Sequence, residues 1–470
     1  MKIIQLYCRR ISTGLLVAVS LIGPGAATAY GQSRALGLEE AIALSLDHSH
    51  ALKIADSQID EAIATVKEAK NHRLPDIDVS GQYLRVNKPN MQLKIGGTQE
   101  TDGEAEQGTA APNVSQAMFG MATATLPLFS GGRISSGIAS AKYLEKAAEL
   151  DAEDNRQQVI QNTVAAYVNL YKAQAAVKLV EENLRSSNRR VADFINMEAN
   201  GLVARNDLLK VQLQESNLEL ALLTAKNEEQ ISNYNFDLML GIAENTPLLL
   251  DSTAVEGRAT TGTLMDWEQT ALDHRADEKA LENRILAAHA AVTGAKSSYY
   301  PTLALRAGYV AVNVPHALTV TNAMNAGAGL SYNLASLYKA GATVRRARAR
   351  EEVLNWNREQ LQDDIKIEIH QAYQDLDQSL KKITVCQKAM VQADENFRIT
   401  KNKYDNSLAT TTDLLDADVA RLQTHIDYEY AKADALVSYY QLHERAGITV
   451  AQYSPLTSQQ NEQSHQQVSQ

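Results

Sequence analysis

The spacing of apolar residues divides the chain into long helical segments and short alternating ones. Across 38–73, apolar side chains recur every three or four positions, which predicts a helix that Pro75 ends. The period then becomes two, and this alternation covers four runs, 77–83, 119–129, 303–309 and 326–334. The pattern therefore predicts two pairs of β-strands, each pair preceded by a helix.

The chain repeats this design. Lys70 and Pro75 match Lys296 and Pro301 at an offset of 226 positions, and beyond the strands the offset becomes 206 and holds without a gap. The difference means that the loop within the first strand pair is 20 residues longer. We therefore predict two repeats, each with a helix, two strands and a long helical hairpin, over 30–242 and 266–448, joined by a linker over 243–265.

The hairpin helices are predicted to be very long. Between Gly137 and Gly201 lie 63 residues with neither Gly nor Pro, which as continuous helix would span roughly 95 Å. Their apolar residues form a narrow seam, which is typical of helices packed side by side as in a coiled coil. The phrase over 200–209 recurs over 406–415, and each copy interrupts such a helical stretch. We interpret both copies as the tight turns of helical hairpins.

The first 29 residues have the three parts of a secretory signal peptide. Three cations, Lys2, Arg9 and Arg10, precede an apolar run over 11–22, and small residues form a cleavage site at 27–29. The apolar run is too short to favour a membrane-spanning helix. We therefore expect export with cleavage of the signal.

The two cysteines and the tail complete this prediction. Cys8 lies before the apolar run, where a lipid-attachment cysteine is not expected, and Cys386 is then left alone. The mature chain is therefore expected to be unlipidated and without an intramolecular disulfide. The segment 449–470 is rich in Gln and Ser and is predicted to be disordered.

Charge and motifs exclude several kinds of function. Loss of the signal peptide takes the formal net charge from -11 to -14, which argues against a nucleic-acid partner. The segment Gly132 to Gly137 has the spacing of a phosphate loop, but Ile138 stands where the lysine is required. The run 47–50, Asp-His-Ser-His, is interpreted as a polar break rather than a metal site. We predict no enzyme activity, no cofactor and no metal.

A basic run marks the start of the second long hairpin. Arg345, Arg346, Arg348 and Arg350 lie just beyond the predicted strands. We interpret this run as the start of a helix that faces solvent or lipid headgroups.

Four strands are too few for a closed barrel. Strands of about ten residues match the length needed to cross an outer membrane, but a transmembrane barrel needs at least about eight of them. The sequence therefore predicts that several chains share one barrel and leaves their number open. The alternative is a periplasmic or surface coiled-coil scaffold without a pore, since the helical seam alone fits both.

The order of elements resembles the TolC family of outer-membrane efflux channels. The resemblance covers about residues 36–448 and includes Gly201-Leu202-Val203-Ala204 at one turn and Asp413-Leu414-Leu415-Asp416 beside the other. It implies a mainly α fold with a small β-barrel part. Three chains would share a 12-stranded barrel in outer-membrane lipid of a Gram-negative bacterium, and their hairpins would form a periplasmic α-barrel. A periplasmic adaptor and an inner-membrane pump would be its partners in tripartite efflux or type I secretion.

The resemblance also implies roles for residues at the two turns. The adaptor would dock at Gly201, Leu202, Val203 and Ala204, and at Ser407 and Leu408 in the second repeat. Asp413 and Asp416 would narrow the pore, and Asp207 and Tyr404 would take part in links that keep the tips closed. In the first repeat Lys210 stands where Asp416 stands in the second, and Ala409 occupies the place of an arginine that commonly completes the links.

Overall fold

The computed structural model describes residues 34–85, 87, 115–251, 262–315 and 318–448. The predicted signal peptide, the tail and most of the first strand loop lie outside these residues. The helices are α1 (Leu38–His48), α2 (His50–Asn71), α3 (Arg133–Ala199), α4 (Arg205–Leu240), α5 (Leu264–His274), α6 (Ala276–Lys296), η2 (Ser297–Tyr299), α7 (Ser336–Asp405) and α8 (Thr411–Arg445). The strands are β1 (Arg34–Leu36), β2 (Asp76–Arg85), β3 (Gln116–Phe129), β4 (Leu248–Leu250), β5 (Thr302–Val314) and β6 (Leu318–Ser331).

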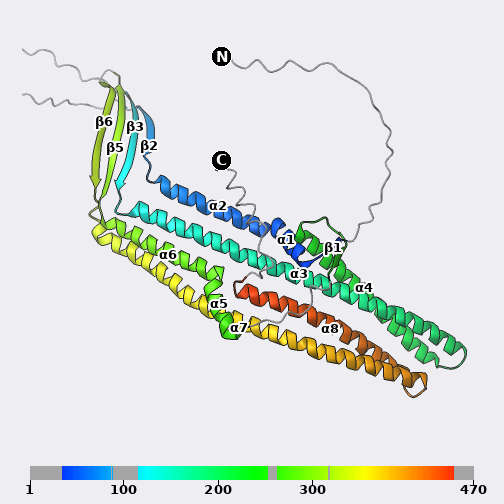
Figure 1. The fold of residues 1–470 in the computed structure, drawn as a ribbon. Helices are drawn as coiled ribbons and strands as arrows, with labels where there is room; N and C mark the ends of the chain where they lie inside the picture. Colours follow the sequence, from blue (N-terminus) through cyan, green and yellow to red (C-terminus); the bar gives the residue numbers. More distant parts are fainter. Residues whose placement is uncertain (1–33, 86, 88–114, 252–261, 316–317, 449–470) are drawn as a thin grey trace, which may run out of the picture.

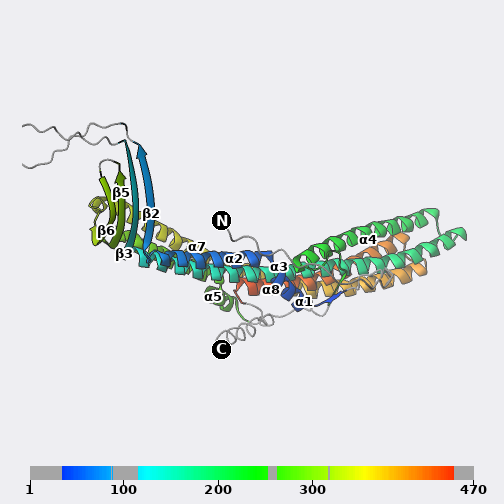
Figure 2. The ribbon, with the colours of Figure 1, turned by 90° about the horizontal axis from the view of Figure 1, so that it is seen from above.

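The molecule is an elongated bundle of helices with a β-sheet at one end (Figure 1). α3 has 67 residues and α7 has 70, so each is about 100 Å long. α2 and α6 accompany them on the sheet side, and α4 and α8 return alongside them from the opposite end, where both hairpin turns lie (Figures 1 and 2). The two predicted repeats of helix, strand pair and long hairpin are thus confirmed.

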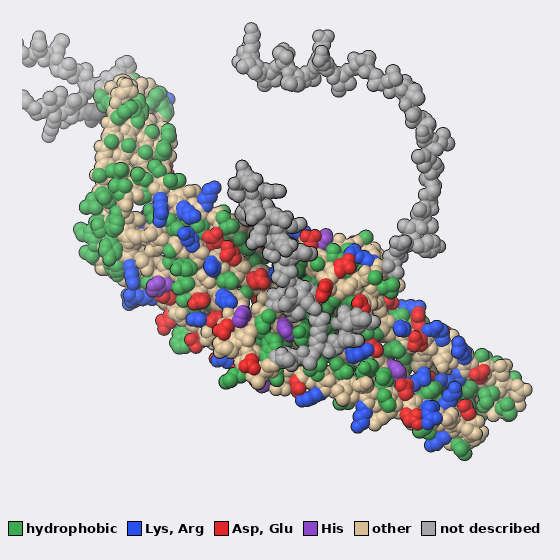
Figure 3. Space-filling model, in the orientation of Figure 1, with side chains coloured by type: hydrophobic (Ala, Val, Ile, Leu, Met, Phe, Trp, Pro, Cys, Tyr) green, Lys and Arg blue, Asp and Glu red, His purple; other side chains and the backbone are tan. Residues whose placement is uncertain are grey.

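Four antiparallel strands form the sheet in the order β2-β3-β5-β6. Their register places Val79 beside Ala122, Ala122 beside Tyr309, and Tyr309 beside Met324. Because paired residues point to the same side, the alternating apolar positions of all four strands share one face. Hydrophobic side chains accordingly dominate the strand end of the molecule, while charged ones gather along the helices (Figure 3). The fourth strand ends at Ser331, so Tyr332 and Leu334, which were predicted to continue its alternating run, lie beyond the strand.

The predicted first helix is divided in two at Ser49. The Ser49 hydroxyl accepts a hydrogen bond from the backbone N–H of Leu52 (3.4 Å), which caps the start of α2. His48 instead bonds the Leu44 carbonyl oxygen through Nδ1 (3.1 Å). The helix does break within Asp47 to His50, as the polar run indicated. Among the described residues, no group of at least three His, Cys, Asp or Glu side chains is placed to hold a metal ion.

A small parallel sheet was not predicted. β1 pairs with β4, which lies inside the predicted linker. The Tyr167 hydroxyl on α3 donates to the carbonyl oxygens of Leu36 and Asp251 at the ends of these strands, at 3.3 and 3.1 Å. Three-residue strands are too short to show a period of two, and their pairing joins segments that are more than 200 positions apart. The linker also contains the first residues of α5.

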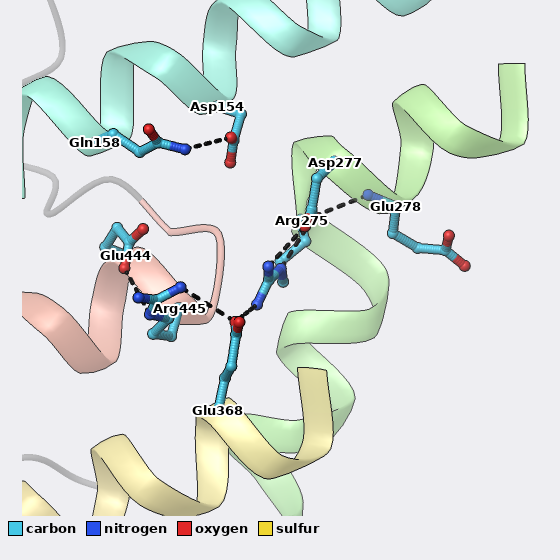
Figure 4. Close-up of polar contacts among 8 residues, drawn as sticks. All are labelled: Asp154, Gln158, Arg275, Asp277, Glu278, Glu368, Glu444 and Arg445. Carbon is cyan, nitrogen blue, oxygen red and sulfur yellow. Dashed lines mark hydrogen bonds and ion pairs between the residues drawn. The ribbon is translucent and has the colours of Figure 1, made fainter. Parts of the chain in front are cut away.

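An ionic network joins α5, α6, α7 and α8 near the middle of the bundle (Figure 4). Arg275 lies at the junction of α5 and α6, donating to Asp277 (2.6 Å) and to Glu368 on α7 (2.6 Å). Arg445 at the end of α8 donates to the same Glu368 (3.2 Å). Asp154 on α3 lies opposite this network, and burial, followed by the nearby charge of Asp277, raises the pKa of its carboxyl group.

This raised pKa predicts how stability depends on pH. The folded state holds a proton on Asp154 more tightly than the unfolded state does. Ionisation of Asp154 therefore lowers stability as the pH rises above 3.8, the ordinary pKa of an aspartate. Asp154→Asn should therefore raise the thermal midpoint at pH 7.5, with a smaller gain at pH 4. Glu153→Gln removes an equal charge from an exposed neighbouring position and is the control, whereas Asp151 is unsuitable because it pairs with Arg284. An equal gain from Asp154→Asn at both pH values would contradict the prediction.

Candidate functional site

The two hairpin turns have the same backbone geometry. Gly201 follows α3 with a φ of 72°, and Ser407 follows α7 with a φ of 59°. After the first helix, the Leu202 N–H donates to the Met197 carbonyl (2.8 Å), and after the second the Leu408 N–H donates to the Lys403 carbonyl (2.7 Å). These bonds, with a left-handed residue before them, are the Schellman pattern that ends helices. The repeated phrase therefore encodes the same helix end twice.

This geometry is strained only in the second repeat. Glycine adopts a positive φ without cost, whereas serine pays roughly 1–2 kcal/mol for it. Ser407→Gly should therefore raise the thermal midpoint, and Gly201→Ala should lower it. A methyl group at Gly201 would meet no other atom within 4 Å. The effect of Gly201→Ala therefore reports the cost of the positive φ and not a steric clash. Opposite shifts in thermal denaturation are expected, and a loss of stability in Ser407→Gly would contradict this account.

The turns present apolar side chains at the far end of the molecule. Leu202 is 72% exposed and Leu408 is 77% exposed. Val203 instead packs against a small apolar core between the hairpins, and Ala204 is the exposed N-cap residue of α4. Each turn thus exposes one leucine at an equivalent position.

The two acids beside the second turn lie on one exposed face of α8. Asp413 and Asp416 are three residues apart and both exposed. The Asp413 carboxylate accepts hydrogen bonds from the Thr410 hydroxyl (2.7 Å) and backbone N–H (2.9 Å), and these bonds lower the pKa of Asp413. Asp413 therefore also caps its helix.

The first repeat uses its equivalent acid differently. Ala204 stands where Thr410 stands in the second repeat, so no capping box forms there. Asp207 accepts from Lys210 (3.2 Å), and the same Lys210 ammonium group reaches the Thr412 hydroxyl on α8 (3.4 Å). Lys210 therefore links the two hairpins at the tips.

Tyr404 also lies between the hairpins. Its ring stacks on Phe194 of α3 with 5.8 Å between ring centroids. Burial raises the pKa of Tyr404, and the negative charge of Asp207 raises it further. Asp207 thus lies close enough to Tyr404 to act on it electrostatically, while Arg205 pairs with Glu198 across its own turn (3.6 Å).

Sequence reasoning missed a buried ion pair just above the tips. Arg190 on α3 donates to Asp418 on α8 at 3.0 Å, and their side chains are 12% and 2% exposed. Arg421 lies 3.5 Å from the other oxygen of Asp418. One signal was present, because Asp418 follows the buried Leu414 by four residues and so falls on the apolar stripe of its helix.

Comparison with known proteins identifies the fold. A family model described as outer membrane efflux protein matches residues 41–241 and 267–447. The structure of CusC matches with a TM-score of 0.74 at 17% identity, over 88% of this chain and 92% of CusC. VceC from Vibrio cholerae matches with a TM-score of 0.70 at 19% identity, over 87% and 96% of the two chains. The CmeC channel from Campylobacter jejuni gives 0.70 at 18%, over 91% and 88%.

The match to the family model covers most of both repeats and leaves out the whole predicted linker, 243–265. Comparison with curated proteins finds no significant match. In the part of the chain that the structure describes, no helix is both long and apolar enough to cross a membrane. The family assigns the chain to transport rather than catalysis, and to channels rather than to pore-free coiled-coil scaffolds. The chain therefore belongs to the outer membrane efflux protein family, the TolC-like efflux channels.

Proposed function

We propose that three copies of this chain form one exit duct, with a shared 12-stranded barrel in the outer membrane. The observation that carries the proposal is the sheet, whose apolar face runs across all four strands. β2 and β6 each have one described neighbour, so each leaves an edge for a strand of another copy. The polar face, which holds Asp78, Thr123 and Asn325, would line the duct. The number three follows from the resemblance to the TolC family.

The helices offer a matching surface for assembly. α4 carries a stripe of exposed apolar side chains at mostly heptad-like spacing, Leu209, Leu213, Leu220, Leu223, Ile231 and Leu238. A stripe of this length on one chain is expected to be covered by another helix. Neighbouring copies would cover it and extend the barrel as a periplasmic α-barrel.

The hairpin turns would dock a periplasmic adaptor in a tripartite system, and an inner-membrane pump would supply the energy. Support comes from Leu202 and Leu408, two exposed leucines at the end opposite the strands, which apolar grooves of a partner hairpin could bind. The chain would reach the membrane through a signal peptide cleaved after residue 29, without lipidation.

Assembly and conductance test this function together. The detergent-solubilised protein should have the mass of three chains by native mass spectrometry and should dissociate on heating. Reconstituted into a planar bilayer, it should give uniform conductance steps. A monomer in detergent that gives no conductance would refute the duct.

A further prediction concerns the acids at the tips. Threefold symmetry would bring six carboxylates of Asp413 and Asp416 to one opening, where they would bind multivalent cations. Asp416→Asn should weaken block of conductance by such cations, and addition of Asp413→Asn should weaken it further. Asp405→Asn removes an equal charge from an exposed position nearby and serves as the control. Unchanged block in the double variant would place the pair away from the constriction.

A further inference from the structure

A cavity of about 360 Å³ lies where the strands meet the long helices. Its walls come from the starts of α3, β5 and α7, from η2 and from the end of β6. Arg133 and Lys339 line it, most of the other lining side chains carry hydroxyl groups, and none is a carboxylate. In a chain with 56 acids and 45 cations, a lining of this kind creates a local site for an anion.

The two cations occupy equivalent positions in the two repeats. Arg133 and Lys339 are 206 positions apart, as are Ser130 and Ser336, which line the same cavity. Each repeat therefore contributes a serine and a cation three residues later. Equivalent four-residue segments of the two repeats thus form part of the cavity wall.

Neither cation is neutralised within the structure. No described carboxylate forms an ion pair with Arg133 or Lys339. On α7, Arg346 and Arg350 follow Lys339 at intervals of seven and four residues, so they continue the same helical face. Neither of these arginines pairs with a described carboxylate either.

The helix starts add positive potential at the same place. α3 and α7 both begin beside the cavity, and neither has a side-chain cap or an acid in its first turn. The positive ends of two long helix dipoles therefore lack their usual compensation. An anion at this point would supply it.

A largely buried serine offers a free hydroxyl group to a ligand in the cavity. Ser297 lines the cavity although it is only 6% exposed, and its hydroxyl group makes no hydrogen bond to any described residue. The hydroxyl oxygen is not among the fully enclosed unpartnered atoms of the described residues, so it is open to the cavity. A ligand oxygen in the cavity would satisfy it.

We propose that this cavity binds a phosphate group, held by Arg133 and Lys339 and by surrounding hydroxyl groups. A phosphate has several acceptor oxygens, which match the many donors better than a halide would, and arginine binds it in a bidentate manner. The phosphate belongs either to a solute in the duct or to a lipid headgroup.

The register of the strands bears on the source of the phosphate. Thr302 pairs with Ser331, and both line the cavity, whereas the apolar pair Leu303 and Leu330 lies on the opposite face. The cavity is therefore associated with the polar face of the sheet. This step depends on the proposed function, in which that face lines the duct, and it favours a solute.

The test measures the binding of a free phosphate and of a phospholipid to the intact assembled protein. Binding of inorganic phosphate is followed by calorimetry at constant ionic strength, and retention of phosphatidylglycerol from nanodiscs by native mass spectrometry. Arg133→Gln with Lys339→Gln should weaken one of the two by at least about tenfold. The control, Arg345→Gln with Arg348→Gln, removes the same charge from the other side of α7 and should leave binding unchanged.

The outcomes distinguish a solute from a lipid headgroup, and they test the phosphate site separately from the proposed duct. Loss of phosphate binding identifies a solute site, and loss of lipid retention alone identifies a headgroup site. If the glutamine variant assembles poorly, Arg133→Lys with Lys339→Arg keeps the charge and should keep the binding. Equal binding by parent and glutamine variant, or no saturable binding of either probe, overturns the site. Normal assembly and conductance in that case would leave the proposed duct intact.

Discussion

Arg190→Ala is expected to destabilise the packing of the two hairpins near their tips by about 3 kcal/mol, because it leaves the Asp418 carboxylate buried without its main partner. Arg421 lies 3.5 Å away and is itself 31% exposed, so it compensates only in part. Hydrogen–deuterium exchange of the assembled protein should show faster exchange around residues 186–194 and 411–421. Exchange near the strands should not change.

Two further variants separate the ion pair from the packing around it. Arg190→Met with Asp418→Leu removes both charges and should restore much of the protection, since the cost comes from the unpaired charge. Arg421→Ala should have a smaller effect than Arg190→Ala. Wild-type protection in Arg190→Ala would show that Asp418 does not depend on Arg190.

Leu202→Asp is expected to weaken binding of the cognate adaptor by tenfold or more. A few side chains at the centre of an interface contribute about 2 kcal/mol or more, and a carboxylate would be desolvated there without a partner. Leu408→Asp tests the second turn in the same way. Binding is measured with the assembled duct in detergent and the purified adaptor.

A matched control distinguishes docking from general effects of exposed charge. Met265 is 78% exposed at the start of α5, away from the tips, and Met265→Asp should leave adaptor binding unchanged. Both leucine variants should assemble as the parent does, because neither side chain belongs to the apolar core between the hairpins. Normal adaptor binding by both leucine variants would remove the docking proposal.

The long elements could be predicted because their signals are local. The change from a helical period to a period of two at Pro75 placed β2 within a residue or two of its true limits. The repeated phrase located both hairpin turns, but it did not reveal that Ser407 adopts a positive φ. The same reasoning placed Asp413 and Asp416 on one face, but it did not reveal that Asp413 also caps α8.

Sequence alone determined the two repeats, the strands, the long hairpin helices and their turns, because periodicity and helix breakers act over a few neighbouring residues. Tertiary structure alone decided three features. It paired β1 with β4, placed Arg190 against Asp418 across 228 positions, and brought Arg133 and Lys339 to one cavity. Such contacts join residues that are distant along the chain, so no local sequence pattern indicates them. They form only when the long helices pack side by side.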